Sequence, residues 1–152
     1  MSAPDAVVSI RALPEDHHPH ASDADIVEIP MTAHDRRRVR RVIEAADGTK
    51  LAFELPTGTV LHPGQVVHRS GVREYVVTAA PEDVLVTRPR SVEEAARIGH
   101  LIGNLHRDIE VHGGDVIALA DDALADRLTR AGVPFERSRR AFQGRAPGEH
   151  AH

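Results

Sequence analysis

The sequence contains no cysteine and no tryptophan, and only four of its 152 residues are aromatic. Without cysteine the chain has no disulfide, no thiolate metal site and no cysteine nucleophile. Apolar residues still make up 41% of the chain, which is enough for a hydrophobic core. That core must consist mainly of valine, leucine, isoleucine and alanine, so we expect each small domain to be only modestly stable.

Long apolar stretches are also missing, and no run approaches the roughly 20 residues that a membrane helix needs. The first residues lack the basic start and apolar stretch of a signal peptide. The net charge of −4 argues against a general nucleic-acid binder. We therefore expect a soluble, cytoplasmic protein that binds neither membranes nor nucleic acids. One basic run, residues 36–41, is predicted to be the solvent face of a strand, with Val39 facing inward.

Motifs of the common enzyme classes are absent as well. The chain has no Gly-x-Ser-x-Gly elbow, no P-loop, no Gly-x-Gly-x-x-Gly and no His-Glu-x-x-His. A small metallohydrolase would need an open coordination position and a placed general base, and the scattered carboxylates suggest no such base. We therefore predict that the protein is not an enzyme.

The first half of the chain has the pattern of an all-β domain, predicted over residues 1–79. Short apolar or alternating segments are separated by turn signals, of which Asp47-Gly48 is a strong hairpin signal. No helical pattern competes before residue 90. The predicted strands are residues 7–13, 26–29, 39–45, 51–55, 66–67 and 74–77.

The second half, residues 80–142, changes to the order strand, helix, strand, strand, helix, strand. Ser91 and Glu94 form a predicted capping box, in which each side chain bonds the other residue's amide, for a helix that ends near Leu105. Gly113-Gly114 predicts a two-residue hairpin, and a second helix starts at Asp121 or Asp122 and stops at Gly132. This βαββαβ order is the ferredoxin-like pattern. The predicted fold class is therefore α+β, with residues 143–152 as a flexible tail.

Eleven histidines make imidazole the most plausible metal ligand of the chain. His106 lies near the end of the first helix, where the helix dipole favours a bound cation. His100 lies six residues earlier and projects about 120° away on a regular helix, so the two cannot hold one ion together. Transition-metal sites generally need about four ligands. The missing ligands must come from a second chain, from the tail, or from both.

A two-fold dimer would bring His106 of each chain to one shared site. The tail residues His150 and His152 could then close over the ion. Because they are two residues apart in an extended tail, either one could reach the ion, but seldom both at once. Weaker candidates for additional sites are His17, His18, His20, His100 and His112. We expect His34, His62 and His68 to be surface residues.

Several of these features together resemble one known family. Residues 103–106 read Gly-Asn-Leu-His, residues 55–61 read Leu-Pro-Thr-Gly-Thr-Val-Leu, the basic segment precedes Asp47-Gly48, and histidines end the chain. In this order the motifs resemble the urease accessory protein E family, the nickel metallochaperones of urease. The resemblance implies a homodimer through ferredoxin-like domains, nickel between the two His106 side chains, and tail histidines that complete its shell. It also implies partner binding by the β domain, with the urease accessory GTPase and the urease apoprotein–accessory complex as partners.

The chain also departs from the family pattern. Leu105 stands where the family often has arginine, and His100 lies one residue before the family's other helix histidine, so that role is not transferred to it. Auxiliary histidines before the second helix are absent, which predicts about one ion per dimer. The leading hypothesis is a chaperone for Ni(II), with Zn(II) or Cu(II) as alternatives in vitro. The rival hypothesis is a protein-interaction module of urease maturation whose metal binding is incidental.

Overall fold

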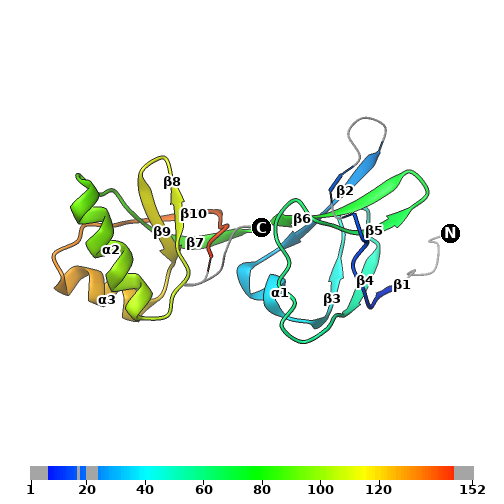
Figure 1. Ribbon diagram of the computed structural model, residues 1–152, viewed down its shortest axis with the longest axis horizontal. Helices are drawn as coiled ribbons and strands as arrows, with labels where there is room; N and C mark the ends of the chain where they lie inside the picture. Colours follow the sequence, from blue (N-terminus) through cyan, green and yellow to red (C-terminus); the bar gives the residue numbers. More distant parts are fainter. Residues whose placement is uncertain (1–6, 17, 20–23, 146–152) are drawn as a thin grey trace. The chain divides into compact units, whose positions relative to one another are not determined.

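The computed structural model describes residues 7–16, 18–19 and 24–145, which form ten strands and three helices (Figure 1). The chain divides between Ala80 and Pro81 into two compact units, called unit 1 and unit 2 below. The predicted mixture of sheets and a few helices is confirmed. No helix in the described part of the chain is long and apolar enough to cross a membrane.

Unit 1 contains two three-stranded sheets, with the strand orders β1-β4-β3 and β2-β6-β5. In β4, apolar side chains that point into the core alternate with more exposed ones, since Leu51 and Phe53 are buried while Glu54 is exposed. This period of two residues is typical of a strand with one buried face. Inward-facing residues of both sheets form one core cluster. The elements are β1 (Val7–Ile10), β2 (Asp25–Met31), α1 (Ala33–Arg37), β3 (Arg40–Glu44), β4 (Lys50–Glu54), β5 (Val66–Ser70) and β6 (Arg73–Ala79).

The short helix α1 shows that the interpretation of the basic run was wrong for residues 36 and 37, which lie in a helix and not in a strand. The Thr32 hydroxyl accepts a hydrogen bond from the Asp35 amide at 3.1 Å, and Asp35 Oδ2 accepts one from the Thr32 amide at 3.2 Å. This reciprocal capping box starts a helix where none was expected. Arg36 is buried, and its Nη1 donates to the Met31 carbonyl at 2.9 Å. Val39 and Arg40 behave as predicted, since Val39 packs against the core of unit 1 and Arg40 is exposed in β3.

Unit 2 is a four-stranded antiparallel sheet with the order β10-β7-β9-β8 and two helices. Both helices pack against one face of this sheet, where Leu85 and Val116 meet Ile98 and Leu124 in a second core cluster (Figure 1). Gly113 and Gly114 both have positive φ, which confirms the predicted two-residue hairpin. The elements are β7 (Pro81–Thr87), α2 (Val92–Asn104), β8 (Glu110–His112), β9 (Asp115–Leu119), α3 (Asp122–Arg130) and β10 (Glu136–Ala141).

Helix α2 begins one residue after Ser91, whose hydroxyl accepts from the Glu94 amide at 3.1 Å. The second half of the predicted capping box is wrong, because Glu94 Oε2 accepts from the Arg90 amide at 2.8 Å. The glutamate side chain reaches past the cap residue to a donor outside the helix.

The predicted flexible tail, residues 143–152, is not free at its beginning. The Ile109 amide donates to the Arg145 carbonyl at 3.2 Å, and the Arg145 amide donates to the Ile109 carbonyl at 2.9 Å.

Candidate metal centre

His106 lies in the turn that ends α2. Its amide donates to the Gly103 carbonyl at 2.9 Å, and the Arg107 amide donates to the Ile102 carbonyl at 3.4 Å. These two hydrogen bonds define a Schellman motif, in which the residue after the cap adopts a left-handed conformation. His106 has that conformation, with a φ of 54°, and its side chain is exposed. The motif therefore presents the imidazole to solvent at the negative end of the helix dipole.

The end of α3 offers a direct comparison within the same chain. There the Gly132 amide donates to Thr129 and the Val133 amide to Leu128, which is the same pair of bonds, and Gly132 has a φ of 71°. Glycine is the usual residue at this position because a Cβ costs about 1 to 2 kcal/mol in the left-handed region. His106 is the only non-glycine residue with positive φ in the described part of the chain. Strained backbone of this kind clusters at functional sites, so His106 remains the candidate ligand of this chain.

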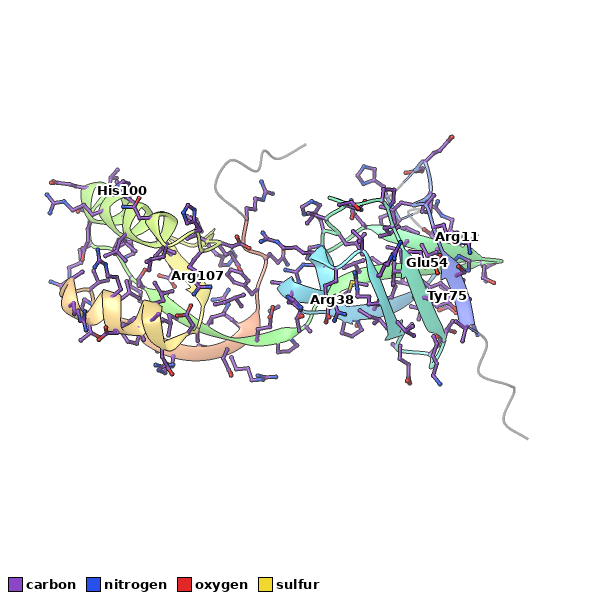
Figure 2. All side chains as sticks on the ribbon, turned by 90° about the horizontal axis from the view of Figure 1, so that it is seen from below. Arg11, Arg38, Glu54, Tyr75, His100 and Arg107 are labelled. Atoms are coloured by element: carbon purple, nitrogen blue, oxygen red, sulfur yellow. The ribbon has the colours of Figure 1, made fainter. Side chains whose placement is uncertain are left out.

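The segment that carries His106 is attached to the start of α3. Arg107 Nη2 lies 3.0 Å from Asp121 Oδ2, and Asp121 Oδ1 accepts a hydrogen bond from the Leu124 amide at 2.8 Å (Figure 2). Asp121 therefore caps α3, as one of the two predicted cap residues, and also binds the residue that follows His106. This ion pair connects the residue after His106 to the cap of α3.

We predict that loss of this ion pair weakens metal binding more than it weakens the fold. Asn at position 121 still caps the helix, because Asn and Asp are equivalent N-caps, but it does not pair with the Arg107 charge. Residues that orient a ligand typically affect metal affinity by about 10-fold or more. Asp121→Asn should therefore weaken nickel binding by about 10-fold in titration calorimetry, with little change in melting temperature.

The matched control is Asp126→Asn, which breaks another 3.0 Å pair on α3, between Asp126 and Arg130. This variant should bind nickel like the wild type. Equal nickel affinities for the two variants would show that the Arg107 pair does not position His106.

Among the described residues, His106 shares no hydrogen bond or ring contact with a second histidine. His100 is exposed on α2, and its Nε2 lies 3.1 Å from Asn104 Nδ2 (Figure 2). His112 is exposed in β8. Within residues 7–16, 18–19 and 24–145, no group of three or more histidine, aspartate or glutamate side chains is placed to hold an ion. Four candidate ligands lie outside the described residues, namely His17, His20, His150 and His152.

The described histidines of unit 1 differ in their exposure and in their contacts. The loop that carries His18 is attached to β5, because Arg69 donates to the Asp16 and His18 carbonyls at 2.9 and 3.0 Å. His34 and His62 are exposed, as expected. His68 is half-buried, which corrects its prediction as a surface residue.

The surroundings of His68 were missed because they form only when β5 pairs with β6. Its ring contacts the Tyr75 ring at 5.5 Å between centroids, and burial lowers its pKa. The Tyr75 hydroxyl in turn donates to Asp47 at 2.9 Å (Figure 2). Burial alone would raise the pKa of Asp47, but hydrogen bonds from Thr49 and Tyr75 and the charge of Arg73 lower it overall. This network holds the predicted Asp47-Gly48 turn in place.

Comparison with known proteins places both units in one family. Residues 9–80 match the family description "UreE urease accessory protein, N-terminal domain", and residues 82–152 match its C-terminal domain. A urease accessory protein UreE from Deinococcus radiodurans is 51% identical over 86% of this chain and 84% of its own length. The corresponding protein of Synechococcus sp. (strain JA-3-3Ab) is 46% identical over 84% of this chain and 85% of its own length.

A more distant relative extends the same result. The urease accessory protein UreE of Corynebacterium efficiens is 31% identical over 85% of this chain and 84% of its own length. These relatives are named as accessory proteins of an enzyme and not as the enzyme itself. The predicted family is thus confirmed, and the chain belongs to the UreE family of urease accessory proteins.

Proposed function

We propose that this chain is a nickel metallochaperone, in which Ni(II) is the cargo and His106 of two copies forms the binding centre. Membership of the family gives the chain a role in urease maturation. The observation that carries the nickel proposal is the exposed imidazole of His106 in a left-handed helix end where the equivalent position of α3 has glycine. Neutral imidazole is a good ligand for nickel, copper and zinc.

The proposed site needs two chains, because one imidazole cannot hold a divalent ion tightly. We assign unit 2, with its order β10-β7-β9-β8 and two helices on one face, to the ferredoxin-like class and propose it as the dimerisation domain. A two-fold axis beside the α2 ends would place the two His106 rings at one ion. His150 and His152 of the tail would supply the remaining ligands.

Transfer of the ion follows from the unequal ligands of this site. The tail ligands leave first and open the coordination sphere, after which the receiving protein exchanges its own ligands for His106. We propose the urease accessory GTPase and the urease apoprotein–accessory complex as receivers. Zinc and copper would compete for the same imidazoles in vitro, since copper binds such ligands more tightly than nickel does.

The experiment that tests this function is native mass spectrometry together with titration calorimetry, with and without nickel. We expect one nickel per two chains in the wild type. The double variant His150→Ala, His152→Ala should bind nickel about 10-fold more weakly but keep the same stoichiometry, because the two His106 side chains remain.

The control for this experiment is His34→Ala, which removes an exposed histidine from unit 1 and should leave nickel binding unchanged. A monomer that binds nickel as tightly as the dimer would contradict the shared site. Complete loss of nickel binding in the tail variant would contradict the assignment of the main ligand to His106.

A further inference from the structure

Strand β3 forms an edge of the sheet β1-β4-β3 in unit 1. The Leu55 amide bonds to the Val39 carbonyl and the Ala45 amide to the Thr49 carbonyl, so the odd-numbered residues between them pair with β4. The main-chain groups of Arg40, Val42 and Glu44 therefore point away from β4, and none has a hydrogen-bond partner among the described residues. All three residues are exposed, and 61% of the Val42 surface is accessible.

The start of this edge carries positive charge that is not neutralised. Arg38 and Arg40 are exposed, and neither forms an ion pair with a described residue (Figure 2). Glu54 lies opposite Arg40 in the ladder, but its carboxylate is bonded to Arg11 Nε at 3.1 Å. The two arginines and the three edge residues 40, 42 and 44 are called the β3 docking edge below.

The opposite face of β3 is held firmly in the core. The Arg41 guanidinium lies over the Phe53 ring at 4.9 Å from its centroid, and Arg41 Nη2 lies 3.5 Å from Met31 Sδ. These contacts fix the strand from the inner side. The β3 docking edge is therefore a preformed row of main-chain donors and acceptors, which reduces the entropy cost of binding an extended chain.

We propose that the β3 docking edge binds an extended acidic segment of a partner protein in urease maturation, which adds a strand to the sheet beside β3. Main-chain hydrogen bonds to residues 40, 42 and 44 would supply affinity, and carboxylates of the segment would pair with Arg38 and Arg40. The proposal rests on the transfer step of the proposed function, in which the chain meets a receiving protein. A polypeptide fits better than a nucleic acid, because the edge offers carbonyl acceptors as well as amide donors, and a phosphate backbone has no donors for the carbonyls.

The first test uses a labelled ten-residue peptide of alternating glutamate and valine, acetylated and amidated, and fluorescence anisotropy with the full-length chain. We expect specific binding of this peptide and at least about 10-fold weaker binding of the corresponding lysine–valine peptide. The variant Arg38→Glu, Arg40→Glu should bind the acidic peptide at least about 10-fold more weakly than the wild type. No difference between the acidic and basic peptides would overturn the proposal.

The matched control is Arg97→Glu, Arg130→Glu, which changes the net charge equally at two exposed helix positions of unit 2. Its peptide affinity should stay within about two-fold of the wild type, since neither residue belongs to the β3 docking edge and the loss follows local charge. An equal loss in both double variants would overturn the proposal, because it would show only a response to overall charge.

The second test addresses the main-chain pairing. Two versions of the acidic peptide are N-methylated at every second main-chain nitrogen, one at the odd and one at the even positions. Methylation removes amide donors without changing the charge of the peptide. Binding of one of the two versions should fall at least about 10-fold. Val42→Pro removes the outward amide of an edge residue, which edge strands tolerate, and should have the same effect. Full binding of both methylated peptides would overturn the proposal. The proposal would also be overturned if a single-stranded oligonucleotide displaced the labelled peptide more strongly than unlabelled peptide does, because this would indicate a general polyanion site.

Nickel titration of Arg38→Glu, Arg40→Glu separates this inference from the proposed function. Nickel affinity should match the wild type, because the variant changes only unit 1. If the wild type bound nickel but not the peptide, the docking-edge proposal would be rejected and the proposed chaperone function would stand. Peptide binding without nickel binding in the wild type would support the edge and remove the nickel site.

Discussion

Replacing His106 with glycine should abolish tight nickel binding while it stabilises unit 2. Loss of a group that only orients a ligand costs up to about 100-fold in metal affinity, so loss of both His106 ligands from a dimer should cost about 100-fold or more. Glycine adopts the left-handed conformation of residue 106 without strain, so unit 2 should gain about 1 kcal/mol in unfolding free energy. Alanine should lose nickel equally but gain no such stability, because its Cβ retains the strain.

Calorimetric nickel titration and thermal unfolding of both variants measure these two effects separately. His100→Ala is the control, since it removes an exposed histidine of the same helix, six residues before His106. That variant should bind nickel like the wild type. Equal stability of the glycine and alanine variants would disprove the strain at His106, and tight nickel binding by either would disprove its role as the main ligand.

Replacing Phe53 with alanine should unfold unit 1 selectively. Phe53 is 1% exposed in the core cluster of unit 1, and such a truncation typically costs about 3 to 5 kcal/mol. This is a large part of the stability of a small domain, so unit 1 should melt at a much lower temperature. Unit 2 has its own core cluster and should keep its transition. Nickel affinity should stay within about two-fold of the wild type, while the acidic peptide should no longer bind.

The reciprocal variant is Leu124→Ala, which truncates a fully buried side chain in the core cluster of unit 2. It should cost about 2 to 5 kcal/mol and weaken nickel binding, while peptide binding persists. Differential scanning calorimetry measures the unfolding transitions of the two units, and titrations with nickel and with the acidic peptide measure the two affinities. If both variants lost the two activities together, the units would not act as separate binding domains.

Features encoded within a few neighbouring residues were predictable from the sequence. Ser91 and Asp121 begin the two helices of unit 2, and Gly132 ends the second, because caps depend on hydrogen bonds within one turn. Alternating burial in β4 and the Gly113-Gly114 hairpin follow from the same kind of local rule. The motifs at residues 55–61 and 103–106, taken together with the basic segment and the terminal histidines, were sufficient to predict the family, and they made His106 the candidate ligand.

The capping box at Thr32 and Asp35 was also local, yet it was missed because the arginines that follow it dominated the interpretation. Its consequence, the burial of Arg36 against the Met31 carbonyl, needed the fold of unit 1. The half-buried His68 likewise depends on Tyr75, which faces it only when β5 and β6 pair. Such contacts join residues that no short-range pattern relates.

The sequence by itself determined the succession of strands and helices in unit 2, the family and the identity of the candidate ligand, since these depend on residue type and short spacing. Only the tertiary structure decided how that ligand is presented. The Arg107–Asp121 ion pair beside His106 exists because the end of α2 meets the cap residue of α3, which lies 14 residues away from Arg107 in the chain. The free edge of β3 was decided in the same way, because strand order is a property of the folded sheet.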